Sequence, residues 1–147
     1  MTDQLELARA CAEAMFSRDR ASQSLGMRIV EARPGYSLVT LTIVDSMVNG
    51  HAIAHGGITF TLADSAFAFA CNSRNEPNVA LQASISYIAA VKLGDVLFAQ
   101  AQEQSSRGRT GVYDIRVTRG DADGELVALF RGVCYRIAGT VLDGANT

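Results

Sequence analysis

The spacing of apolar side chains divides the chain into helical and extended stretches. Apolar residues recur at intervals of three and four over about residues 3–20, which predicts an amphipathic surface helix. Residues 57–74 are apolar on nearly every side and rich in alanine, which predicts a helix enclosed by other elements. From residue 79 onward, apolar and polar positions alternate as they do in strands.

Six strands are expected, at 27–33 and 36–44 before the enclosed helix and at 79–87, 96–104, 110–119 and 125–137 after it. Turn-forming residues separate consecutive strands, so we expect neighbours along the chain to pair antiparallel. The order lacks the alternation of parallel βαβ units. It predicts an α+β fold in which one curved antiparallel sheet wraps around a long central helix.

Length and composition limit the possible classes of protein. The 147 residues suit one domain over 1–147, with a core at about 25–138 and a frayed tail at 139–147. Charged residues make up 19% of the chain and the net charge is −2, so we expect no nucleic-acid partner. No basic leader and no apolar run of about 20 residues is visible, which predicts a cytoplasmic protein without a membrane partner. Three widely spaced cysteines, Cys11, Cys71 and Cys134, are expected to be reduced and buried.

One acidic residue stands out. Between Ser46 and Ser73 the only formal charge is Asp64, in the otherwise apolar stretch 58–71. An aspartate is a poor helix-interior residue, and burying an unpartnered carboxylate costs several kcal/mol. The polar, glycine-rich run 49–57 precedes it, so we expect a reaction site here.

The residues around Asp64 resemble a known family. The run from Asn49 to Asp64, with His55-Gly56-Gly57 inside it, resembles the signature of hotdog-fold acyl-CoA thioesterases. Segments 63–73 and 110–115 resemble the phenylacetic acid degradation (PaaI) branch of that family, and the similarity covers about residues 20–138. It implies a hotdog fold and hydrolysis of phenylacetyl-CoA or of related hydroxylated or ring-opened aryl-acyl-CoA. Coenzyme A would then be part of the substrate, and no separate cofactor is expected.

The positions of Gly56 and Asp64 predict a shared site. A helix that begins near Gly56 offers free backbone N–H groups to polarise a thioester carbonyl, and glycine lets that carbonyl approach closely. Asp64 lies eight residues further on, about 12 Å away at 1.5 Å per residue. If both serve one reaction, they come from different copies of the chain, which predicts a homodimer with two composite sites. The resemblance further implies a homotetramer, as a pair of dimers.

The resemblance assigns roles to the remaining candidates. Asp64 would act as nucleophile or as general base on water, and Asn49 would position the water or the carboxylate. His55 would order the loop and could assist in polarising the carbonyl. Tyr87 would line the pantetheine path. The segment expected to hold the phosphates of coenzyme A consists of Arg107, Gly108, Arg109, Thr110 and Gly111.

Each assignment has a plainer alternative. Asp64 could be a structural residue at a dimer seam, Asn49 could form only a turn, and the arginine segment could be a solvated hairpin. His51 and His55 have metal-ligand spacing, but the surrounding glycines disfavour a helix and no third ligand is near, so we expect no metal.

One departure from the family and two rival functions also remain. Some relatives carry serine where this chain has Ala80, so either Asn49 and Asp64 orient the water without it or Ser84 or Ser65 substitutes. His55 and Asp64 could instead serve an acyl-thioester hydratase or dehydratase. The same pocket could also belong to a non-catalytic acyl-CoA sensor.

Overall fold

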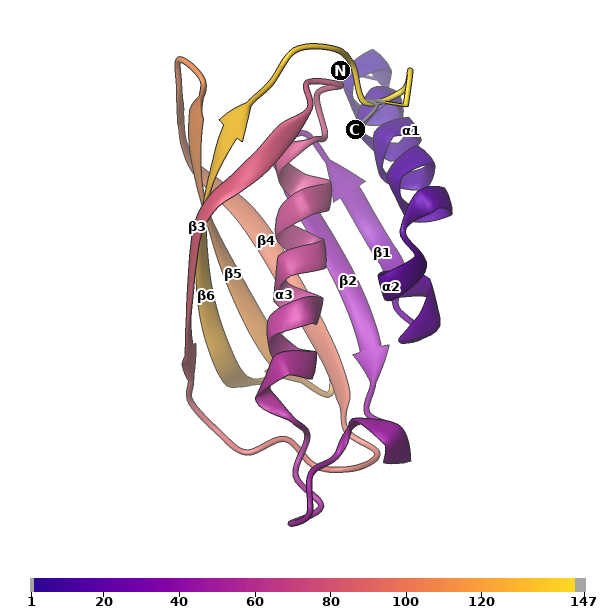
Figure 1. The fold of residues 1–147 in the computed structure, drawn as a ribbon, viewed down its shortest axis with the longest axis vertical. Helices are drawn as coiled ribbons and strands as arrows, with labels where there is room; N and C mark the ends of the chain where they lie inside the picture. The colour runs from indigo at the N-terminus through magenta and orange to yellow at the C-terminus, as the bar shows by residue number, and fades with distance from the viewer. Residues whose placement is uncertain (1, 145–147) are drawn as a thin grey trace.

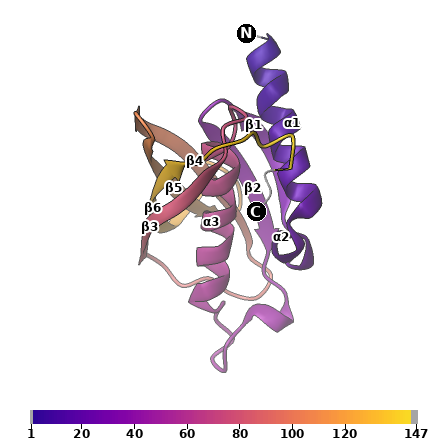
Figure 2. The same ribbon diagram turned by 45° about the horizontal axis from the view of Figure 1, so that its top comes forward.

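A computed structural model describes residues 2–144 and shows one curved sheet around a helix. The elements in chain order are α1 (Thr2–Arg18), α2 (Arg20–Ser24), β1 (Arg28–Arg33), β2 (Tyr36–Thr42), the 3-10 turn η1 (Asp45–Met47), α3 (Gly56–Cys71), β3 (Asn78–Tyr87), β4 (Val96–Arg107), β5 (Thr110–Arg119) and β6 (Glu125–Arg136). The sheet order is β1-β2-β4-β5-β6-β3, and every pair is antiparallel. Figures 1 and 2 show α3 along the inner face of the sheet, with α1 and α2 beside β1. The predicted α+β hotdog fold is confirmed.

The core forms between α3 and the inner face of the sheet. Leu62, Phe67 and Phe69 of α3 are among the largest fully buried side chains. The helix can be this apolar because strands cover most of its circumference. Gly132 of β6 makes room for it, since a Cβ there would lie 2.6 Å from the Phe67 ring. Tight packing of this kind fixes the position of α3 against the sheet.

The strand pairing after α3 differs from the prediction. Turn residues at 93–95 led us to expect β3 and β4 as neighbours, but β3 pairs with β6 and β4 lies between β2 and β5. The N–H of Gly94 donates to the Ile43 carbonyl, and the N–H of Ile43 donates to the Asp95 carbonyl. The turn therefore extends the β2–β4 ladder, and residues 88–95 form a crossover instead of a hairpin.

Strand β3 lies at one edge of the sheet and is exposed on both faces. Val79 and Leu81, which the alternation placed on one face with Ile85, are 45% and 60% exposed. A bulge between Ala80 and Gln82 shifts the register and moves the later side chains relative to the earlier ones. Within residues 2–144 one row of backbone groups on β3 has no neighbouring strand, so this edge is open to pairing.

The two ends of the chain pack against each other. Asp19 ends α1 and caps α2, since its carboxylate accepts from the Ser22 N–H. The tail was expected to fray from residue 139, but Val141 is buried and its carbonyl accepts from Arg18. That prediction is wrong for 139–144, because an apolar anchor and a guanidinium fix the segment; residues 145–147 lie outside the described part.

Two further features concern the whole described chain. All three cysteines are buried free thiols, as expected. No helix within residues 2–144 combines the length and the apolar character needed to cross a membrane.

Candidate active site

The N-terminal end of α3 carries a backbone donor that is left free. His55 caps the helix, with Nδ1 accepting from the Gly57 N–H at 3.1 Å. The Ile58 N–H donates to the His55 carbonyl. Among residues 2–144 the N–H of Gly56 donates to no group. It therefore remains available to a ligand at the positive end of the helix dipole.

Tyr87 lies directly beside this donor. Its hydroxyl donates to the Gly56 carbonyl at 2.9 Å. A Cβ on Gly56 would lie 3.1 Å from the Tyr87 ring, so there is little room for a side chain at this position. Both residues line a cavity of about 310 Å³ whose other walls are Ile53, Ala54, Thr59 and residues 88–91. The structure thus brings together the predicted oxyanion donor and one predicted binding residue.

Asn49 organises the loop that leads into α3. Its side-chain oxygen accepts from the N–H groups of His51 (2.9 Å) and Ile53 (3.2 Å). Within one chain Asn49 therefore forms the turn that was its plainer interpretation. Its amide nitrogen makes no hydrogen bond to residues 2–144 and stays available for another partner. Over the same residues no group of three His, Cys, Asp or Glu side chains could hold a metal ion.

Asp64 lies in the middle of α3 and is half-buried. It shares a partly open stripe of the helix with Gly57, Thr61 and Ala68, whereas most other positions of α3 are covered. Burial raises the pKa of the Asp64 carboxyl, and the charge of Asp19 raises it further. Its carboxylate has no hydrogen-bond partner within residues 2–144, so Asn49 is not its partner in one chain.

Asp19 is a neighbour of Asp64 that the sequence did not indicate. It holds Ser22 through both the backbone N–H and the hydroxyl, and the Ser22 hydroxyl lies 2.7 Å from that of Ser65. This chain of contacts fixes the corner between α1 and α2 beside the middle of α3. The two carboxylates are 45 positions apart, and no local pattern connects them.

The two serines considered in place of Ala80 have other surroundings. Ser65 is buried and bonded to Ser22. Ser84 lines a polar hollow with Gln100 and Gln102, on the sheet face opposite α3. Neither lies beside Gly56 in a single chain.

The predicted phosphate-binding segment lies far from Gly56 within one chain. Arg107, Gly108, Arg109, Thr110 and Gly111 form the tip of the β4–β5 hairpin. Figure 1 shows this tip near the C-terminal end of α3, whereas Gly56 begins the opposite end. Cys71 and Gly111 line one small hollow there, and Arg109 donates to the Arg136 carbonyl.

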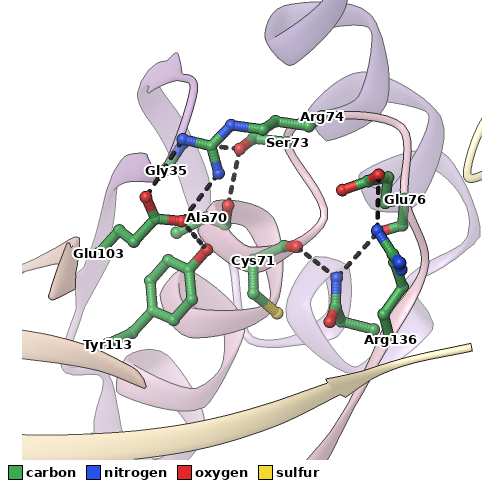
Figure 3. Close-up of polar contacts among 10 residues, drawn as sticks. Gly35, Ala70, Cys71, Ser73, Arg74, Glu76, Glu103, Tyr113 and Arg136 are labelled. Carbon is green, nitrogen blue, oxygen red and sulfur yellow. Dashed lines mark hydrogen bonds and ion pairs between the residues drawn. The ribbon is translucent and has the colours of Figure 1, made fainter. Parts of the chain in front are cut away.

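A polar network at the base of this hairpin was also missed from the sequence. Figure 3 shows Arg74 and Tyr113 converging on the Glu103 carboxylate, at 2.7 Å and 2.8 Å. Nearby, the Ser73 hydroxyl donates to the Ala70 carbonyl and accepts from the Gly35 N–H. These contacts fasten the last turn of α3 to β4, β5 and the β1–β2 turn. The contacts of Arg74 with Glu103 and of Gly35 with Ser73 join residues far apart in the chain, so no local signal could have revealed them.

Comparison with known proteins identifies relatives with this architecture. The model of the thioesterase superfamily matches residues 51–125. The chain is 42% identical to the acyl-coenzyme A thioesterase PaaI of Escherichia coli K12 over 88% of its length and 91% of the relative's. The solved structure of the E. coli PaaI protein superposes with a TM-score of 0.89 at 40% identity, over 92% of this chain and 97% of that one. A Streptococcus mutans UA159 protein solved with bound acetyl CoA gives a TM-score of 0.72 at 30% identity, over 77% and 90%.

The Glu103 network predicts a specific pH dependence of stability. The contact with Arg74 holds the pKa of the Glu103 carboxyl below its usual 4.5. Ionised Glu103 therefore stabilises the folded state at pH values above the usual carboxyl pKa. This contribution is lost as the pH falls through the lowered pKa of the folded state. Between about pH 5 and pH 3 the free energy of unfolding should fall less in Glu103→Gln than in the wild type.

Urea denaturation followed by circular dichroism measures this difference. Glu31→Gln is the matched control, because Glu31 forms an exposed ion pair with Arg33 on β1. It should keep the pH slope of the wild type. Identical slopes in all three proteins would contradict the role given to Glu103.

Proposed function

This chain belongs to the thioesterase superfamily and is a thioester hydrolase, and we propose that it hydrolyses acyl-CoA at sites shared between two copies of the chain. One observation carries the proposal: the free N–H of Gly56 opens onto a cavity, while the only acid of α3 lies about 12 Å along the same helix. One thioester carbon cannot contact both in a single chain. The coenzyme A part of the proposal is supported by the acetyl CoA bound to the S. mutans protein.

The proposed chemistry uses the Gly56 N–H of one copy and the Asp64 carboxylate of the other. The Gly56 N–H and the positive end of the α3 dipole stabilise the negative charge that develops on the thioester oxygen. Asp64 of a second copy either attacks the carbonyl carbon itself or takes a proton from an attacking water. In both cases the C–S bond breaks, the thiol of coenzyme A leaves, and water supplies the oxygen of the acid product.

Two surfaces of the structure support pairing of the copies. The open edge of β3 carries exposed Val79 and Leu81, and the partly open stripe of α3 carries Asp64. If two β3 edges pair antiparallel across a two-fold axis, each α3 runs opposite to the other. The Asp64 of one copy then approaches Gly56 and Asn49 of the other. Further pairing of dimers into a tetramer stays a prediction.

The same arrangement accounts for the position of the arginine hairpin. In one chain the hairpin 107–111 lies at the wrong end of α3 for a ligand at Gly56. In antiparallel copies the C-terminal end of one α3 lies beside the N-terminal end of the other. Arg107 and Arg109 of the second copy can then contact the phosphates of coenzyme A, while Tyr87 lines the pantetheine path.

For the acyl group we propose phenylacetyl or a ring-modified aryl-acetyl group. The similarity to the E. coli PaaI thioesterase over most of both chains supports this choice. A steady-state survey of aryl- and alkyl-acyl-CoA, with release of free thiol as the signal, tests it. The value of kcat/KM should be highest for phenylacetyl-CoA and its hydroxylated forms. A maximum at long alkyl chains would contradict the aryl assignment and leave the thioesterase assignment intact.

Replacement of Asp64 tests the proposed role of its carboxylate as nucleophile or general base. Asp64→Asn should lower kcat by at least about a hundredfold, because the amide can neither attack nor accept a proton, while binding of coenzyme A changes little. Asp45→Asn, at an exposed carboxylate of η1, is the control and should behave as the wild type. Unchanged turnover in Asp64→Asn would refute the assigned role. In the wild type, a change in enoyl absorbance without release of thiol would indicate a hydratase or dehydratase. Binding of acyl-CoA without any turnover would indicate a non-catalytic sensor.

Mixing of inactive variants tests the shared site. Gly56→Pro removes the N–H at the first helical position, where proline is otherwise tolerated, and should be inactive. Gly56→Ala adds the same Cβ beside Tyr87 but keeps the N–H, so it should lose much less activity than Gly56→Pro. Co-refolded Gly56→Pro and Asp64→Asn chains should recover about a quarter of wild-type activity, since half of the dimers are hybrids with one intact site. Native mass spectrometry confirms the hybrids, and no recovery in their presence would argue against a composite site.

A further inference from the structure

One wall of the cavity beside Gly56 is an irregular segment of the crossover. Residues 88–91 follow β3 directly and line the cavity together with Gly56 and Tyr87. Because the segment belongs to neither a helix nor a strand, its position depends on contacts made by individual backbone groups.

Most of those contacts are with neighbouring backbone. The N–H groups of Ile88 and Ala89 donate to the Val127 carbonyl at 2.8 Å and 3.2 Å. The Val91 carbonyl accepts from the Ala54 N–H at 2.7 Å, which ties the wall to the loop before α3. The carbonyl of Ala90, in the middle, accepts from a side chain instead.

That side chain is Arg119, at the end of β5. Its Nη1 donates to the Ala90 carbonyl at 2.7 Å and to the Asp95 carboxylate at 2.8 Å. Its Nη2 donates to Glu125 at 2.7 Å. Asp95 in turn accepts from the Lys92 N–H at 2.8 Å. The guanidinium therefore contacts the crossover 88–95 at two residues, Ala90 and Asp95.

We propose that Arg119 is a positioning residue of the thioester site, which fixes the wall at 88–91 and thereby the width of the cavity that holds the pantetheine arm. This rests on the proposed function, in which Tyr87 and the adjoining cavity receive that arm. Arg119 itself contacts no substrate. The planar guanidinium satisfies three acceptors in a fixed geometry, which the single ammonium of lysine cannot do.

Arg119→Lys tests the proposal, because it keeps the positive charge but loses the planar guanidinium and its several N–H donors. KM for acyl-CoA should rise about five- to tenfold, the effect of one lost hydrogen bond to a charged donor, while kcat stays within about twofold. The dissociation constant of coenzyme A, measured by calorimetry on the same proteins, should rise by a similar factor.

Two matched variants separate this role from a general structural one. Glu125→Gln removes the charge of one partner of Arg119 but leaves the Ala90 contact, so its KM should equal that of the wild type. Arg33→Lys alters another paired arginine, on β1 at the other edge of the sheet, and should also change nothing.

Two outcomes would overturn the proposal. One is an unchanged KM and an unchanged affinity for coenzyme A in Arg119→Lys. The other is a rise of KM in Glu125→Gln equal to that in Arg119→Lys. The ion pair with Glu125, and not the contact with the cavity wall, would then be the cause of the higher KM. A wild-type protein that binds coenzyme A but releases no thiol would instead contradict the proposed function, and the affinities would still test Arg119.

Discussion

The continuity of α3 is the constraint on which the rest of the structure depends. Its 16 residues form one unbroken helix because nearly every face is apolar and the curved sheet covers it. A helix packed in this way cannot bend to bring its own residues together. The free N–H of Gly56 and the carboxylate of Asp64 are therefore held apart by the same packing that stabilises the fold.

The two ends of α3 consequently carry different parts of the proposed site. The N-terminal end has the free donor, the capping His55 and Tyr87 over Gly56, while the C-terminal end is fastened by Arg74, Glu103 and the hairpin beyond them. Only an antiparallel second helix places these unlike ends side by side. Antiparallel pairing at the exposed edge of β3 would produce this arrangement.

Local pattern was sufficient to predict α1, α3 and the six strands, but not the short elements α2 and η1. The period of the apolar residues located α3 and all six strands, and the glycines located the start of α3 within one residue. Contacts across the sheet could not be predicted in the same way. The turn at Gly94 joins β2 to β4, and Asp19 approaches Asp64, through pairings of residues far apart in the chain. Arg119 likewise reaches Ala90 only because β3 and β4 are not neighbours and a crossover spans the space between their ends.

The electrostatics of Asp64 would give the proposed pairing of copies a second function. In one chain, burial and Asp19 both favour the protonated carboxyl, whereas the proposed chemistry needs the carboxylate. A second copy that only covered Asp64 would remove more water and favour the protonated form further. The copy can compensate only if it brings donors. The N-terminal end of its α3 has the Gly56 N–H and the positive end of the dipole, and the loop before it has the Asn49 amide nitrogen, which makes no hydrogen bond within residues 2–144. The group that polarises the thioester would thus also help to keep the acid ionised.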